Sequence, residues 1–174
     1  MFACCAMLTT LPQLNVSKST NFSYMFRGCT SLTTLPQLDT SNGINFSNMF
    51  EDCRSLTAIP QLNVSKGTNF NSMLSGCTNL TTLPQLDTSN GTNFNHMFRG
   101  CRSLTAISFV ENCIGTIISF EYCNALSHDS LISILNGLKT VTSTKTCTLG
   151  ATNLAKLTDE EKAIATQKNW TLAS

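Results

Sequence analysis

The amino-acid sequence predicts a repeat solenoid of mixed α/β class, in which the chain forms stacked coils and ends in a cap. The main observation is a period of 24 residues, marked by Cys5, Cys29, Cys53, Cys77 and Cys101. No insertion interrupts this spacing, and constant spacing is typical of coils that stack in register. A second observation, apolar columns that recur in every unit, indicates which side chains face the core.

Four complete units cover residues 1–96: MFACCAMLTTLPQLNVSKSTNFSY, MFRGCTSLTTLPQLDTSNGINFSN, MFEDCRSLTAIPQLNVSKGTNFNS and MLSGCTNLTTLPQLDTSNGTNFNH. A fifth unit over residues 97–120 keeps only the first half of the pattern. We therefore expect five repeats over residues 1–120 and a capping segment over residues 121–174. Units one and three contain LNVSK, whereas units two and four contain LDTSN. This alternation indicates either the duplication of a two-unit block or a pattern that faces a ligand.

Each unit is expected to contain one short parallel strand and one short helical turn. The segment LTTLP is short and threonine-rich, and Pro36 marks its end because proline has no N–H to donate to a ladder. The segment NFSNMF places Phe46, Met49 and Phe50 at the spacing of a single helical turn. The columns expected to point into the core are those of Met25, Phe26, Cys29, Leu32, Leu35, Leu38 and Phe46.

Glycine is expected to form the turns of each coil. Gly28 and its equivalents in units four and five follow the helical turn, where a left-handed residue ends a helix. Asp52 takes this position in unit three. The Asn-Gly dipeptides at residues 42–43 and 90–91 are typical of a second turn.

The cysteine column is expected to form a buried ladder of free thiols. The thiol is small and weakly polar, and it packs well at a tight corner. Stacked coils lie about 4.8 Å apart, but side chains one coil apart point in parallel, and five cysteines cannot all pair. The sequence has no C-x-x-C motif and only two histidines, so we expect no metal and no cofactor.

The sequence after unit five is expected to cover the last coil. The segment SHDSLISILNGL predicts a helix with Ser127 as its N-cap and Gly137 as its end. Thr158 and Glu161 have the spacing of a capping box for a second helix, DEEKAIATQK. The segment NWTL then supplies a final extended segment, in which Trp170 covers the end of the core.

The repeated motif MFxGCxSLTTLPQLDTSNxxNFSN resembles the leucine-rich repeats of the BspA-like family and of its relatives among Mycoplasma-type surface proteins. The tail TLGATNLAKLTDEEKAIATQKNWTLA is similar to the segment that closes such arrays. The resemblance implies a right-handed leucine-rich-repeat solenoid, and it implies bacterial adhesion or another recognition role at the cell surface. It brings no catalytic residue to this chain.

The composition argues against a nucleic-acid partner and against direct membrane insertion. Eleven basic and ten acidic residues give a net charge of +1, with no cluster of Lys and Arg to neutralise phosphates. No apolar run reaches the ~20 residues of a membrane span, and the first residues lack the pattern of a secretory signal. We expect a cell-surface or secreted setting as part of a longer protein, with self-association possible through the uncapped first coil.

No enzyme is expected, because the titratable residues form no catalytic pattern. His96 occupies a variable, exposed column, His128 lies in the first turn of a helix, and Glu51 with Asp52 is one acidic pair without a matching acid. We expect instead a non-catalytic recognition or adhesion module that binds protein or glycan through the strand face. The alternative is a structural spacer or assembly component, as in a surface layer or a phage tail.

The candidate ligand face consists of polar residues of the LTTLPQ segment, which repeat from coil to coil. A repetitive ligand such as a glycan or a fibrous protein would match this arrangement. Strand propensity alone is the other explanation for the threonines. The residues of this face are Thr9, Thr10, Thr33, Thr34, Thr57, Thr81, Thr82, Thr105, Gln13, Gln37, Gln61 and Gln85.

Overall fold

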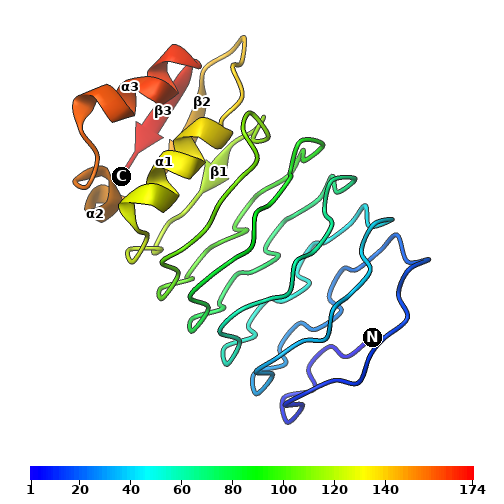
Figure 1. Cartoon of the computed structure of the whole chain (residues 1–174). Coiled ribbons are helices and arrows are strands. Elements are labelled where there is room, and N and C mark those ends of the chain that lie inside the picture. Colours follow the sequence, from blue (N-terminus) through cyan, green and yellow to red (C-terminus); the bar gives the residue numbers. More distant parts are fainter.

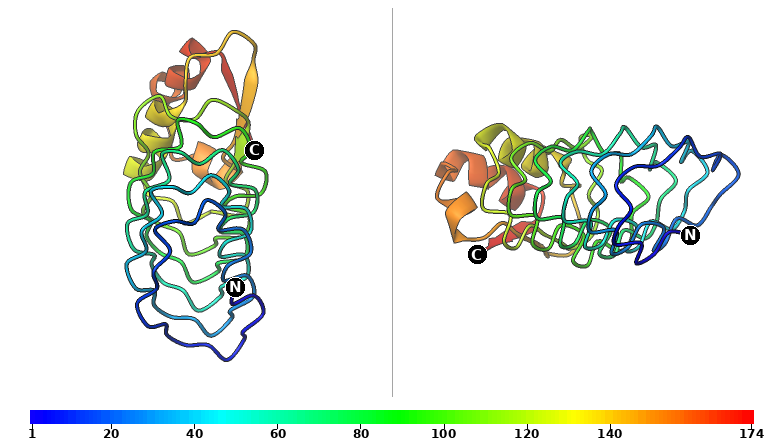
Figure 2. Two further views of the ribbon diagram at one scale, coloured as in Figure 1. Left: turned by 90° about the vertical axis from the view of Figure 1, so that its right-hand side faces the viewer. Right: turned by 90° about the horizontal axis from the view of Figure 1, so that it is seen from below.

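The computed structural model describes all 174 residues. Figure 1 shows that the chain before the first helix winds through a row of coils that lie side by side, with the helices at the C-terminal end. Figure 2 shows the same row from two further sides. The regular elements are β1 (Ile118–Ser119), α1 (His128–Gly137), β2 (Lys145–Thr148), α2 (Ala151–Leu154), α3 (Asp159–Gln167) and β3 (Trp170–Ala173).

One wall of each coil is joined to its neighbours by a regular series of backbone hydrogen bonds. Every second amide from Phe46 to Asp52 donates to a carbonyl of the next coil, at 2.8–2.9 Å. The amides of Met49 and Glu51, which lie between them, donate three residues back within the same coil, at 3.2 Å. We call residues 45–53 and their equivalents in the other coils the ladder wall. Because its amides are satisfied, backbone pairing holds the coils in register here.

The ladder wall contains the NFSNMF segment, which was expected to form a helical turn. No helix forms there, because the ladder wall of each coil contains two residues with a left-handed backbone. Asn48 (φ 57°) and Asp52 (φ 58°) are each the third residue of a tight turn, and a positive φ at that place ends a helix. The left-handed conformation expected at Gly28, Gly76 and Gly100 is confirmed, with φ of 70–76°.

The LTTLPQ segment forms a second wall, which we call the threonine wall (residues 32–38 and their equivalents). It was expected to contain a strand, but it contributes only single parallel bridges, such as Ala58 with Thr82 and Thr82 with Ala106. Few of its amides reach a neighbouring coil, and one that does is Thr81 N–H, which donates to Thr57 O at 2.9 Å. The proline in each of the first four coils removes a donor, and this keeps the wall from extending into a regular strand.

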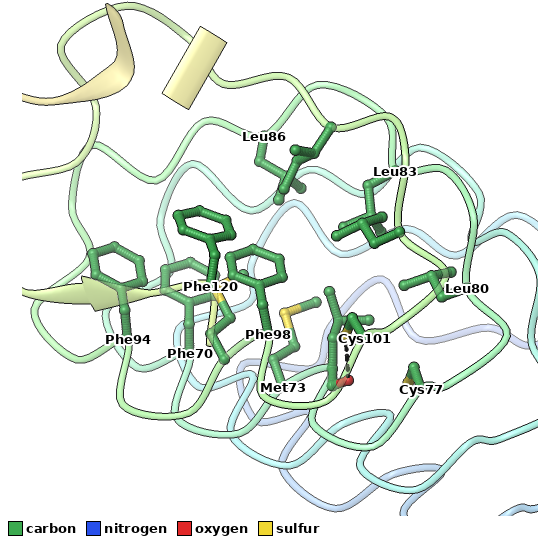
Figure 3. Close-up of a cluster of buried hydrophobic side chains, with 14 of the residues drawn as sticks. Phe70, Met73, Cys77, Leu80, Leu83, Leu86, Phe94, Phe98, Cys101 and Phe120 are labelled. Carbon is green, nitrogen blue, oxygen red and sulfur yellow. Dashed lines mark hydrogen bonds between the residues drawn. The ribbon is translucent and has the colours of Figure 1, made fainter. Parts of the chain in front are cut away.

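The core lies between the two walls. In Figure 3, Leu80 and Leu83 line one side of the coil, whereas Phe94 and Phe98 project from the other. The phenylalanines of the NF dipeptides stack from coil to coil with ring centroids 5.4–5.6 Å apart. Each such pair contributes about 0.5–1.5 kcal/mol beyond the area that it buries. The columns expected to face the core are buried in unit two, except that Leu35 is only half-buried.

At Gly43 the second turn of the coil uses glycine for space rather than for a left-handed backbone. Gly43 N–H donates to Thr40 O at 2.8 Å, which closes a turn at the expected Asn-Gly dipeptide. A Cβ added at Gly43 would lie 2.2 Å from Cζ of Phe46. The stacked ring therefore occupies the place that a side chain would take.

Helix α1 covers the threonine wall of the last coil. Ser127 caps its N-terminus by accepting the Ser130 N–H, and the helix ends at Gly137, both as expected. The Ser130 hydroxyl also accepts the N–H of Ile107 at 3.0 Å. The helix therefore supplies hydrogen-bond partners that another coil would otherwise provide.

The strands β1, β2 and β3 form a parallel sheet that extends the ladder wall into the cap. The capping box expected at α3 is confirmed, since Thr158 and Glu161 exchange side-chain and backbone hydrogen bonds. Trp170 lies in β3 and is only 2% exposed, and its Nε1–H donates to Lys139 O at 2.7 Å. The C-terminal end of the core is thus covered. No helix in the chain combines the length and the apolar character that crossing a membrane requires.

The first coil is covered on one side only. Met1 and Met7 are 88% and 89% exposed, whereas Met25, one coil further on, is 5% exposed. Phe2 and Leu8 are half-buried, because the second coil packs against them. The two ends of the row therefore differ sharply in how much apolar surface they expose.

Candidate functional site

The residues expected to form the ligand face all lie exposed on the threonine wall. Their side chains fall into two groups that only the structure separates. The hydroxyls of Thr33, Thr81 and Thr105 donate to carbonyls of the preceding coil at 3.0–3.2 Å. The hydroxyls of Thr9, Thr10, Thr34, Thr57 and Thr82 form no hydrogen bond within the chain and are open to a ligand.

The glutamine column serves the stacking of the coils. The side-chain Nε2 of Gln13 donates to Gln37 O at 2.7 Å, and Gln37 and Gln61 donate in the same way to the next coil, at 2.6 Å and 3.0 Å. Each of these glutamines directly follows a proline, which has no backbone N–H to donate to a neighbouring coil. Only Gln85, the last of the column, has an amide without such an acceptor.

A groove of about 650 Å³ runs along the glutamine column across several coils. Asp39 and Asp87 line it, with Asn63 between them in the chain. Asp39 accepts the amide and the hydroxyl of Ser41 through Oδ1, at 3.1 Å and 2.6 Å, and these bonds hold the pKa of Asp39 below its ordinary value. Its Oδ2 accepts no hydrogen bond within the chain. The Asn/Asp alternation seen in the sequence therefore faces this groove.

The cysteine column forms a chain of S–H···O hydrogen bonds. Cys53 Sγ donates to Phe26 O at 3.0 Å, Cys77 donates to Phe50 O at the same distance, and Figure 3 shows the bond of Cys101. All nine cysteines of the chain are free. Burial raises the pKa of the Cys77 thiol to about 12, so it remains a protonated donor.

The first cysteine of this column does not share the burial that was expected of all five. Cys5 is exposed, whereas Cys29 is fully buried. The reason is positional: Cys29 packs against the coil before it, and its Sγ donates to Phe2 O at 3.1 Å. Cys5 and its neighbour Cys4 have no such coil beside them and are the two exposed thiols of the chain.

The two histidines lie in different parts of the chain. His96 is exposed and has a left-handed backbone, with φ 57°. His128 Nε2 lies 2.8 Å from Glu161 Oε1, which joins α1 to α3. No group of three or more His, Cys, Asp or Glu side chains is placed to hold a metal ion.

Sequence reasoning missed a cluster of arginines at the corner next to the cysteine column. Arg54, Arg99 and Arg102 line a second groove of about 780 Å³, together with Tyr122. These residues were not singled out because they occupy positions that differ from unit to unit. That variability within an otherwise constant repeat was the available signal.

The fold and the two grooves define a repeat protein built from 24-residue coils, with a polar, mostly uncharged surface. Residues 1–110 match the family DUF285, described as Mycoplasma protein of unknown function, and the chain belongs to this family. Comparisons with the curated proteins and with the solved structures found no match.

Proposed function

We propose that the chain is a right-handed, BspA-like leucine-rich-repeat solenoid that acts as a non-catalytic recognition module at a bacterial surface. The observation that carries this proposal is the groove along the glutamine column of the threonine wall, which presents glutamine on successive coils together with alternating aspartate and asparagine. Its ligand is a glycan or an extended protein with a repeated structure. The setting is the cell surface or the secreted state.

Two features, one of the groove and one of the wall beside it, support a role in binding. The polar groups of the groove are largely uncharged, so a ligand rich in hydroxyl or amide groups meets a small desolvation cost. Beside the groove, on the same wall, the free hydroxyls of Thr10, Thr34 and Thr82 occupy one column of the repeat and face solvent, although they do not line the groove itself. A ligand with a regular repeat can therefore bind several coils at once, and its overall affinity then exceeds that of a single weak contact.

The test is binding of the purified chain to an array of glycans and surface proteins, followed by substitution of the free hydroxyls. Thr10, Thr34 and Thr82 are changed together to alanine. The fold should tolerate this triple variant, because Ala58 and Ala106 occupy the same column in units three and five. We expect saturable binding by the wild type and a loss of about tenfold or more in the variant.

A matched control replaces three exposed threonines of the cap, Thr140, Thr142 and Thr152, by alanine. This control should bind as the wild type does. Equal binding by the control and by the Thr10, Thr34 and Thr82 variant would contradict recognition through the free hydroxyls of the threonine wall.

The second candidate function is a structural spacer or assembly component. The observation in its favour is that the amides of Gln13, Gln37 and Gln61 are used to join coils rather than left free. Self-association through the exposed first coil, together with no binding on the array, would favour this candidate. Sedimentation of the wild type against a Met1→Ser, Met7→Ser variant distinguishes the two.

A further inference from the structure

The variable positions of the repeat gather at one corner of the coil. Thr33 and its equivalents are threonine in all five units, whereas the position of Arg27 holds Ala, Arg, Glu, Ser and Arg in turn. The position three residues later also varies, with Ala, Thr, Arg, Thr and Arg in turn, and it holds Arg54 and Arg102. Residues that stack the coils must recur in every unit. Residues that are not involved in stacking can differ between units and can specify a ligand.

All four arginines of the chain occupy these two variable columns. Three of them, Arg54, Arg99 and Arg102, line the groove of about 780 Å³, which also includes the hydroxyl residues Ser75 and Thr78. The groove spans neighbouring coils at the point where Gly76 and Gly100 turn the chain. We call it the arginine corner.

The charges of the arginine corner are not balanced. Its two carboxylates are already paired: Glu51 lies 2.6 Å from Nε of Arg27, and Asp52 lies 3.1 Å from Nη2 of Arg54. Arg99 and Arg102 are exposed and form no ion pair. Two guanidinium groups are therefore available to one anion in the same groove.

The aromatic ring of the arginine corner belongs to Tyr122, which is one of the residues that line the groove. Tyr122 is 49% exposed and has a left-handed backbone with φ 66°. Arg99, Arg102 and Tyr122 line the same groove. The adjacent Glu121 raises the pKa of Tyr122, because a carboxylate beside the hydroxyl disfavours the charged phenolate. Glu121 forms no ion pair with either arginine.

We propose that the arginine corner binds the carboxylate of an acidic sugar. Guanidinium groups bind carboxylates through paired N–H···O bonds, and two of them can hold one such group firmly. The Tyr122 ring offers a flat apolar surface to the face of the sugar, and Ser75 and Thr78 offer hydroxyls to its hydroxyl groups. A long polyanion does not fit, because the chain carries no extended basic stripe and a net charge of only +1.

The arginine corner is separate from the groove of the threonine wall. An experiment can therefore refute binding at one of these sites without refuting binding at the other. The probe is methyl β-glucuronide, compared with the neutral methyl β-glucoside, by calorimetric titration of the full chain. We expect binding of the glucuronide only, weakened between about 0.02 M and 0.2 M salt because exposed charges are screened. Equal affinity for the two sugars, or no heat from either, would overturn the proposal.

The decisive variant is Arg99→Ser with Arg102→Thr, which gives unit five the residues that unit four already has at these positions. The fold should therefore persist, and glucuronide affinity should fall about tenfold or more. The matched control, Lys18→Gln with Lys145→Gln, removes two positive charges outside the groove and should bind as the wild type does.

Two further comparisons identify the ligand class. Tyr122→Phe should keep most of the affinity, whereas Tyr122→Asn, which suits the left-handed backbone, should lose part of it. A blocked glutamate peptide tests the rival ligand. If the peptide binds as tightly as the glucuronide and Tyr122→Asn has no effect, the site recognises a carboxylate in general and the sugar assignment is wrong.

Discussion

The ladder wall and the threonine wall of the same coil are held together in different ways. On the ladder wall, backbone amides bond alternately to the next coil and to their own coil. On the threonine wall, backbone bonds are sparse, and side chains such as those of Gln37 and Thr81 provide much of the linkage. Stacking of the coils is therefore fixed mainly by the ladder wall. The other wall can change its exposed side chains at a smaller cost in stability.

The largest expected effect is on the core at the ladder wall. Phe70 is fully buried and stacks between Phe46 and Phe94. Phe70→Ala should lower the free energy of unfolding by about 3–5 kcal/mol, because it leaves a cavity that the rigid coils cannot fill. Thr81→Val, on the threonine wall, should lower it by about 1 kcal/mol, the worth of one hydrogen bond. Urea unfolding of both variants checks this comparison, which fails if the two losses are similar.

The next largest effect is expected at the cysteine column, which lies between the walls. Cys77→Ala removes a fully buried thiol and its bond to Phe50 O, and should cost about 1–2 kcal/mol in urea unfolding. Cys5→Ala should cost almost nothing, since Cys5 is exposed. In the native protein, a thiol reagent should modify Cys4 and Cys5 rapidly and the seven buried cysteines only on unfolding. Rapid modification of all nine would contradict the buried column.

A smaller effect of opposite sign is expected at Asp52. Its left-handed backbone, φ 58°, is strained for an aspartate, and Gly28, Gly76 and Gly100 hold the same position in other units. Asp52→Gly should stabilise the chain by about 0.5–1 kcal/mol, less any contribution of the exposed pair with Arg54. Gly76→Ala is the matched reverse change and should destabilise it. A loss of stability in Asp52→Gly would mean that the carboxylate matters more than the backbone.

The smallest effect concerns the pH dependence of the cap. The Thr158 N–H, aided by His128, holds the pKa of Glu161 below its ordinary value. A lowered folded pKa stabilises the fold above the unfolded pKa, about 4.3, and that stability is lost as the pH falls through the folded pKa. Glu161→Gln keeps a capping side chain but not the charge, so its melting temperature should fall less than that of the wild type below about pH 4.3. If the melting temperatures of the wild type and of Glu161→Gln fall equally as the pH is lowered, the charge of Glu161 does not stabilise the cap.

Much of the fold was predictable from local chemistry, and the failures have one cause. Gly28, the Ser127 cap and the Thr158–Glu161 box were correct because each depends on a few adjacent residues. The strand and the helical turn were placed by propensity and spacing alone. The structure puts the regular pairing on NFSNMF instead, because Asn48 and Asp52 adopt a left-handed backbone there, and residue type indicates this only weakly.

The candidate site was predictable only in outline. The exposure of the threonine and glutamine columns followed from the period, but which hydroxyls are free depends on distances between coils. The arginine corner was missed because Arg99 and Arg102 look like ordinary surface charges in a sequence. Their variability from unit to unit was a weak signal, and the structure adds that they share a groove with Tyr122 whose two lining carboxylates, Glu51 and Asp52, are already paired.

Hydrogen exchange resolved by residue tests the difference between the walls most directly. The amides of Phe46, Asn48 and Phe50 donate to the next coil, whereas those of Thr34, Leu35 and Gln37 have no backbone acceptor. We expect the first group to exchange at least about tenfold more slowly than the second, at a rate near that of global unfolding. Equal protection of the two groups, or faster exchange on the ladder wall, would contradict it.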